Sequence, residues 1–141
     1  MTRGELEKNQ ISLRTELADN LPIVLGDRVQ LQQVLLNLIL NAVEAVSAAN
    51  EGPREVLISS SRDQSDGVQI AIHDTGIGLE RSNLDHLFDA FHTTKPGGMG
   101  IGLTISRSII EAHGGSIRAT VNGPRGAVFH FTLPGGRGAE V

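Results

Sequence analysis

Two asparagines and a glutamate stand at the spacing of a helical stripe within the first long apolar segment. Asn37, Asn41 and Glu44 occupy positions i, i+4 and i+7, so a helix places them on one side. Buried amides and carboxylates are costly unless they find partners. Asn41 therefore either bonds to a neighbouring loop or offers its amide oxygen to Mg²⁺, a hard cation that needs few protein ligands when phosphates complete its shell.

A carboxylate and two glycines follow an alternating apolar run near the middle of the chain. In Asp74-Thr75-Gly76-Ile77-Gly78, the glycines let the backbone approach a ligand closely. A carboxylate only accepts hydrogen bonds, so Asp74 suits the exocyclic amine of adenine, which guanine replaces with an oxo group. The competing interpretation is an Asx turn that closes the strand.

A glycine-rich segment, residues 97–102, runs directly into a second predicted helix. Backbone N–H groups at the start of a helix attract phosphate, although a flexible hinge is the alternative. The spacing of Gly98, Gly100 and Gly102 differs from the dinucleotide-binding fingerprint, and no Lys-Ser or Lys-Thr pair follows as in a P-loop.

Polar and aromatic residues stand just upstream of these glycines. Thr93, Thr94 and Lys95 are candidates to contact a terminal phosphate, with Lys95 acting as a point charge. A solvated surface lysine is the alternative for Lys95. Phe88 and Phe91 are three residues apart, so a short helix presents both to one apolar pocket.

Two helices are expected to hold these residues. The first begins at Asp27, an N-cap with Gln30 three residues later, and runs to about Ala49. The second covers about 102–113 and ends at Gly114-Gly115, a sequence typical of a left-handed helix stop.

The strands are expected at 11–17, around 56–58 and 68–72 with a turn at Asp66-Gly67, and in a final hairpin of 117–121 and 127–133. Hairpins in this order predict an α+β, two-layer sandwich with a mixed, mostly antiparallel sheet and helices on one face. We expect one domain over residues 1–141, with a lid at about 79–100 that includes a short helix at 84–91, and a frayed tail at 135–141.

Composition narrows the function classes. A net charge of -4 and an aromatic content of 3% disfavour nucleic-acid binding. The absence of cysteine excludes disulfides and thiolate metal sites. No apolar run approaches the roughly 20 residues of a membrane span. We expect a cytoplasmic polypeptide without direct membrane contact, although a larger parent protein can still be membrane-anchored. His113 near a helix C-terminus is interpreted as a favourable dipole partner.

The order and spacing of four segments carry a family resemblance. Residues 37–42, 74–78, 88–91 and 98–103 resemble the N, G1, F and G2 boxes of the histidine kinase catalytic domain. That domain has the Bergerat-type ATP-binding fold with a flexible lid, shared with type II topoisomerases, heat-shock chaperones and mismatch-repair ATPases. The stretch 91–100, together with Glu111-Ala-His-Gly-Gly115, looks like the nitrogen-regulation and oxygen-sensing branch.

The resemblance implies ATP and Mg²⁺ as cofactors. Asn41 would bind Mg²⁺, while Asp74 would read the adenine amine in a pocket shaped by Gly76 and Gly78. Asn37 and Lys95 are the candidate catalytic residues. The remaining candidates for nucleotide binding are Glu44, Ala45, Ile77, Thr93, Thr94, Lys95, Gly98, Met99, Gly100, Ile101, Gly102 and Leu103.

One departure from the wider superfamily bears on the reaction. Its ATPase members carry a glutamate four residues before the metal-binding asparagine, and this chain has Asn37 there. Because an amide is a poor base, we expect weak hydrolysis. A kinase needs no activated water, since its nucleophile is an imidazole of its partner.

The family's phosphoacceptor histidine lies in an upstream dimerisation segment, and no histidine precedes Leu25. We therefore expect a monomeric chain that does not phosphorylate itself. It would serve the histidine-bearing dimerisation domain of a homodimeric parent and, through it, a response regulator receiver domain. A stand-alone ATPase, an anti-sigma-type serine kinase and a non-catalytic module for protein contacts are the alternatives.

Overall fold

Five strands form a mixed sheet in the computed structural model, which describes residues 11–48, 52, 54–64, 67–77, 99–121 and 126–135. The spatial order is β1-β2-β3-β5-β4, with β1 parallel to β2 and every other pair antiparallel. The strands are β1 (Ser12–Leu17), β2 (Glu55–Arg62), β3 (Val68–Asp74), β4 (Ser116–Val121) and β5 (Ala127–Leu133). The expected strands and the mostly antiparallel sheet are confirmed.

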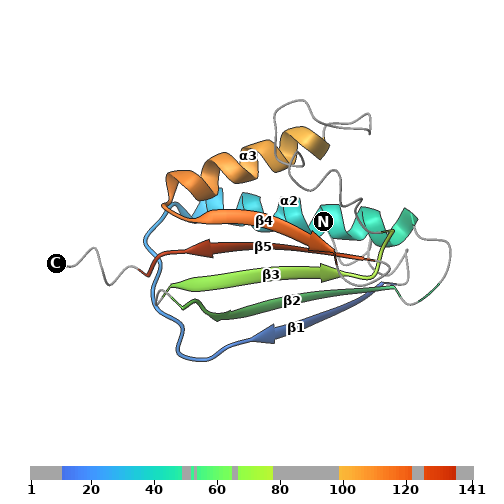
Figure 1. Cartoon of the computed structure of the whole chain (residues 1–141), viewed down its shortest axis with the longest axis horizontal. Coiled ribbons are helices and arrows are strands. Elements are labelled where there is room, and N and C mark those ends of the chain that lie inside the picture. Colours follow the sequence, from blue (N-terminus) through green and yellow to red (C-terminus); the bar gives the residue numbers. More distant parts are fainter. Residues whose placement is uncertain are drawn as a thin grey trace.

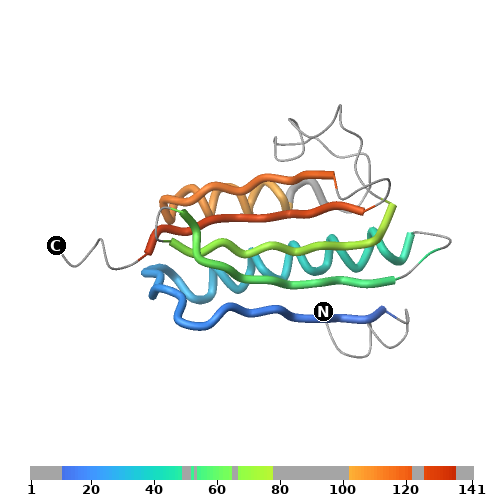
Figure 2. Tube along the Cα trace, turned by 60° about the horizontal axis from the view of Figure 1, so that its bottom comes forward, coloured from blue at the N-terminus to red at the C-terminus, as the bar shows by residue number. Residues whose placement is uncertain are grey.

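Both described helices, α2 (Arg28–Ala48) and α3 (Met99–Ala112), lie on the same face of this sheet (Figures 1 and 2). The two-layer α+β sandwich is therefore confirmed. The helices run in opposite directions, so the start of α2 lies beside the end of α3 (Figure 1). The other end of the molecule brings together the end of β3, the C-terminal half of α2 and the side on which α3 begins.

Local signals fix both ends of the helical layer. Asp27 caps α2 as expected, because its Oδ1 accepts the Gln30 N–H at 3.0 Å. Gly114 has φ 83° just after α3, and the Gly115 N–H donates to the Ile110 carbonyl at 3.0 Å, which is the Schellman stop. The start of α3 was expected at Gly102 but lies at Met99. The low helix propensity of glycine hides this first turn from the sequence pattern.

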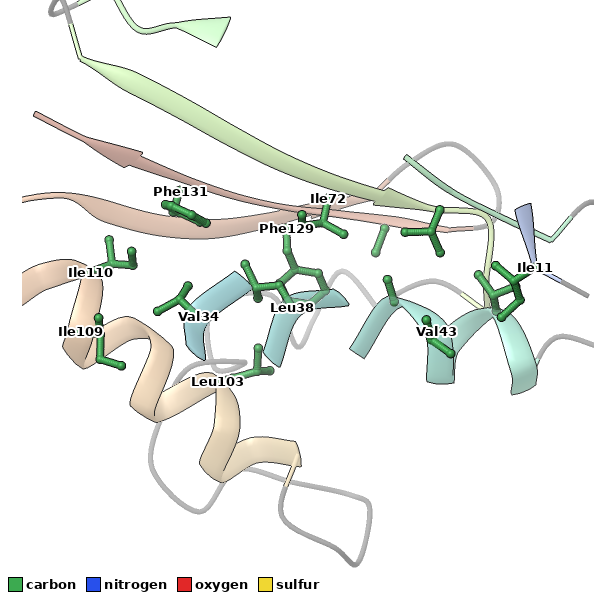
Figure 3. Packing of buried hydrophobic residues seen from close by; sticks show 14 of the residues in the cluster. Ile11, Val34, Leu38, Val43, Ile72, Leu103, Ile109, Ile110, Phe129 and Phe131 are labelled. Carbon is green, nitrogen blue, oxygen red and sulfur yellow. The ribbon is translucent and has the colours of Figure 1, made fainter. Parts of the chain in front are cut away.

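Aliphatic and phenylalanine side chains fill the space between the layers. Leu38 and Val34 of α2 point toward the sheet, where Phe129 of β5 and Ile72 of β3 meet them (Figure 3). By length and mean hydropathy α2 would suffice to cross a membrane, although polar residues interrupt its apolar run as the sequence shows. In this fold α2 is the core helix that packs against β2, β3 and α3.

One further expectation needs correction. The β2–β3 connection is wider than a two-residue turn, because β2 ends at Arg62, β3 begins at Val68, and the Asp63 N–H donates to the Gly67 carbonyl at 2.9 Å. Apolar and polar residues alternate along β1, but every residue of this strand is exposed, and Leu17 is 65% exposed. Because β1 is an edge strand, its alternating pattern predicts the strand correctly but does not identify a face that is buried in the core.

His130 gives the sheet a pH-sensitive position. It alternates along β5 with Phe129 and Phe131 of the core, so it lies on the face away from the helices, yet it is only 7% exposed. Its Nδ1 accepts a hydrogen bond from the Arg118 Nε at 3.2 Å, which requires the neutral ring. Burial, and then the charges of Arg118 and His73, lower the pKa of His130 below its usual range.

Acidification is expected to destabilise the domain through His130. Because its pKa is lower in the folded protein, the unfolded chain takes up the proton first as the pH falls through the ordinary value of 6.5. Stability from the neutral ring is therefore complete well above that value and is lost below it. Urea unfolding at about pH 7.5 and about pH 5.5 should show this loss in the wild type and a smaller loss in His130→Gln. An equal loss in both proteins would exclude His130 as the cause.

Candidate functional site

The chain leaving β3 lies directly against the C-terminal half of α2. The Ile77 N–H donates to the Ala45 carbonyl at 3.2 Å. A Cβ on Gly76 would lie 2.5 Å from the Ala45 oxygen and 2.7 Å from the Val46 nitrogen, closer than real Cβ atoms approach. Glycine is therefore required at position 76 by the contact with the helix backbone, and this contact fixes the turn after β3.

Asp74 lies at the base of this turn and is 1% exposed. Its Oδ1 accepts the Gly76 N–H at 2.9 Å, so the Asx turn considered from the sequence is present. Burial raises the pKa of the Asp74 carboxyl, while backbone hydrogen bonds from Gly76 and Ala127 act in the opposite direction. A carboxylate has about four acceptor positions, so an Asx turn and a ligand contact are compatible.

The neighbouring strand also shapes the surroundings of Asp74. Gly126 has φ 89°, and a Cβ there would collide with the Asp74 carbonyl oxygen. The next residue, Ala127, pairs with Asp74 across β5 and β3. Sequence reasoning missed both residues. The only signal was the glycine at the start of the last strand, and nothing local indicates that it faces Asp74.

The predicted polar stripe of α2 divides into three different environments. Asn37 is half-buried and its Nδ2 donates to the Ser106 Oγ at 3.3 Å and the Gly102 carbonyl at 3.5 Å, both in α3. Asn41, one turn later, is 9% exposed, while Glu44 is exposed to solvent. Asn41 thus lies between two contact points of α2, with α3 on one side and the Gly76 turn on the other.

His113 joins the opposite ends of the two helices. Its Nε2 accepts the Asp27 N–H at 3.0 Å, and its Nδ1 lies 2.7 Å from the Ile109 carbonyl. Since a backbone N–H can only donate, Nε2 is unprotonated and Nδ1 carries the hydrogen. The ring therefore links the two helices through its two nitrogens, and its contact with a last-turn carbonyl of α3 agrees with the predicted position at the helix C-terminus. Gly26 leaves the space that this ring occupies.

Several predicted site residues lie outside the described part of the chain. These are Gly78, Thr93, Thr94, Lys95 and Gly98, together with the side chains of Met99 and Ile101 and the surroundings of Gly100. The expected helix at 84–91 and most of the expected lid and tail also lie outside it. Within it, Gly102 is half-buried beside Asn37, and Leu103 is a core residue whose side chain points toward α2 (Figure 3).

Substituting Gly76 by alanine is expected to destabilise the domain by about 1–3 kcal/mol, because the methyl group overlaps the backbone of α2. Gly102→Ala provides a matched control. Among the described residues its Cβ would meet only Asn37, at 3.9 Å, and alanine favours a helix, so this variant should be at least as stable as the wild type. Urea unfolding of both variants measures the difference. Equal stability of Gly76→Ala and the wild type would mean that the turn can move away from α2.

Comparison with known proteins finds similar sequences and similar solved structures. A family model described as "Histidine kinase-, DNA gyrase B-, and HSP90-like ATPase" matches residues 26–137. The sensor protein FixL of Bradyrhizobium diazoefficiens is 46% identical over 131 residues, which are 93% of this chain and 25% of FixL. The chain therefore spans about a quarter of the length of that relative.

Solved structures show the same fold. The catalytic domain of the histidine kinase ThkA is 33% identical with a TM-score of 0.78, covering 94% of this chain and 84% of that one. ThkA has also been solved in complex with the response regulator protein TrrA. Full-length ShkA in complex with AMPPNP is 30% identical with a TM-score of 0.80, covering 94% of this chain and 27% of ShkA.

Proposed function

The chain belongs to the family of histidine kinase-, DNA gyrase B- and HSP90-like ATPases, as an ATP-binding catalytic domain of the sensor histidine kinase type, and from this premise we propose that it holds Mg-ATP for transfer of the γ-phosphoryl group to a histidine on a dimerisation segment. The parent would be a homodimer, and the phosphoryl group would pass on to a response regulator receiver domain. The domain would work on the cytoplasmic side.

The observation that carries this proposal is the buried carboxylate of Asp74 at the Gly76 turn. An almost fully buried carboxylate that titrates above its usual range is costly for a purely structural role. A carboxylate has about four acceptor positions, some of which take the Gly76 and Ala127 N–H groups, and the exocyclic amine of adenine is a donor that matches this acceptor-only group. Ala45 and Ile77, joined by a backbone hydrogen bond, would form the adjoining wall of the adenine site.

Asn41 is the residue of this chain that would hold Mg²⁺. An amide oxygen suits this hard cation, which takes only one or two protein ligands when phosphates supply others. The metal would neutralise charge that develops on the phosphate oxygens during transfer. The chain's own contribution is to fix Asn41 between the two contacts of α2 and to keep the adenine end of the nucleotide at Asp74. Thr93, Thr94, Lys95 and the glycines at 98, 100 and 102 would approach the phosphates.

Asn37 makes this site a poor hydrolase. It occupies the position at which ATPases of the family need a base, and its amide cannot take a proton from water at neutral pH. Transfer to an imidazole requires no such base on this chain, because the lone pair of the neutral imidazole nitrogen attacks phosphorus while the bond to the ADP oxygen breaks. The proton on the other ring nitrogen then leaves to the partner segment or to solvent. Positioning and charge stabilisation then account for most of the rate.

The test supplies the missing partner. The purified chain is mixed with the dimerisation segment of its parent kinase and γ-radiolabelled ATP, with a segment whose histidine is replaced by glutamine as the control. We expect label on the segment only when the histidine is present, and this label should be lost in acid, as phosphohistidine is. Acid-stable label on serine, or release of free phosphate without labelled protein, would contradict the proposal.

A further inference from the structure

We propose that Asn37 is a positioning residue, whose side-chain amide holds the first turns of α3 against α2 and so fixes the distance between Asn41 and the glycines at the start of α3. The inference rests on the proposed function for its effect on phosphoryl transfer. The contact itself is a property of the fold and can be tested without a nucleotide.

The amide of Asn37 reaches two acceptors on neighbouring positions of α3. Its Nδ2 lies 3.3 Å from the Ser106 Oγ and 3.5 Å from the Gly102 carbonyl oxygen. Residues 102 and 106 are four apart, so both acceptors lie on the same side of α3. An amide nitrogen has two hydrogens, which allows it to serve both acceptors at once.

Ser106 makes this contact specific. It is 0% exposed, and a buried hydroxyl requires a hydrogen-bonding partner. Asparagine can donate to both the hydroxyl and the Gly102 carbonyl, whereas an aspartate of the same shape could only accept from the hydroxyl and would place a negative charge against that carbonyl. The pair therefore explains why an amide at position 37 is compatible with this fold, independently of any contact with a substrate.

The contact lies at the place where movement of α3 would matter most. Asn41 follows Asn37 by one turn of α2, and Gly102 is one of the glycines proposed to approach the phosphates. A displacement of about 1 Å at a reacting centre can reduce a rate by about 100-fold. A hydrogen-bonded link between Asn37 and the first turns of α3 would therefore keep the metal ligand and the phosphate-binding turn in register.

The far end of the same helix pair offers a matched control. His113 links the end of α3 to Asp27 at the start of α2, through the Nε2 contact at 3.0 Å. His113→Ala also removes a hydrogen bond between these helices, but it does so far from Gly102. A general loss of α2–α3 packing would appear in both variants, whereas a positioning effect would appear only at the Asn37 end.

The experiment compares Asn37→Asp, Ser106→Ala and His113→Ala in the full chain. Transfer of phosphoryl to the supplied dimerisation segment is measured at saturating Mg-ATP, ADP affinity is measured by calorimetry, and amide exchange is followed along α3. We expect both variants at the Asn37–Ser106 contact to transfer about 10- to 100-fold more slowly and to exchange the first-turn amides of α3 faster. His113→Ala should fray the last turn instead and keep most of the transfer rate. A double-mutant cycle adds Asn37→Ala and its combination with Ser106→Ala. The transfer rate of the double variant should be little lower than that of either single variant.

Two results would overturn the proposal. A full transfer rate in Ser106→Ala together with a slow rate in Asn37→Asp would make Asn37 a catalytic residue that touches the substrate. Unchanged exchange at the first turn of α3 in both variants would show that the contact holds nothing in place. If the wild-type chain neither transferred phosphoryl nor bound ADP, the proposed function would be contradicted. The amide-exchange measurement would still decide whether Asn37 positions α3.

Discussion

Replacing Asp74 by asparagine is expected to weaken ADP binding by about 10- to 150-fold. A hydrogen bond to a charged group contributes about 1.5–3 kcal/mol, and each 1.4 kcal/mol corresponds to about a factor of ten in affinity. The variant keeps the shape of the side chain but turns one acceptor into an NH₂ group, which would face the amine of adenine. Selectivity for adenine over guanine nucleotides should fall as well, because the residue that distinguishes them has changed.

Calorimetric titration of the wild type and the variant with Mg-ADP and Mg-GDP measures both effects. Asp19→Asn removes the same charge from an exposed position and serves as the control. A melting curve identifies any loss of folding, since Asp74 also accepts the Gly76 N–H of the Asx turn. Equal ADP affinity in a folded Asp74→Asn would remove Asp74 from the adenine site.

Removing the amide of Asn41 is expected to slow phosphoryl transfer much more than it weakens nucleotide binding. Asn41→Ala should slow phosphoryl transfer to the dimerisation segment on the order of 100-fold, the usual effect of losing one electrostatic group at a reacting centre. ADP affinity should fall far less, because Asp74 and the Gly76 turn hold the adenine end. The Mg²⁺ concentration needed for half-maximal transfer should rise in the variant.

An exposed glutamine on the same helix provides the control for this prediction. Gln33→Ala changes α2 at the surface and should leave both transfer and Mg²⁺ dependence close to wild type. Asn41 is 9% exposed, so the variant's stability is checked by urea unfolding before its rate is interpreted. A folded Asn41→Ala with the wild-type rate and wild-type Mg²⁺ dependence would exclude Asn41 as a metal ligand.

The parts of the fold that sequence predicted are those set by neighbouring residues. Asp27 caps its own helix three residues on, Gly114 ends α3 by its own backbone angle, and the alternation in β5 follows from strand geometry. The sensor kinase family was also evident, because four short motifs stood in the right order. The cap, the helix stop and the alternation are each contained within a few residues, and the order of the four motifs is a property of the sequence itself, so a single sequence carries all of these signals.

The contacts that sequence did not predict join residues far apart in the chain. Asn37 and Ser106 are separated by 69 positions, and Asp27 and His113 by 86. Neither pair leaves a periodic pattern, since each depends on how α2 and α3 lie side by side on the sheet. The sequence did not predict the burial of His130 on the outer face of the sheet either. Alternation identifies the apolar face of a strand, but it does not show what covers the opposite face.

A crystal structure of this chain grown with Mg-ADP would decide whether the adenine is bound as proposed. We expect the exocyclic amine of adenine to lie within hydrogen-bonding distance of the Asp74 carboxylate, with the ring beside Gly76 and the metal on the Asn41 amide oxygen. Nucleotide bound elsewhere on the domain, with Asp74 bonded only to protein atoms, would contradict this assignment.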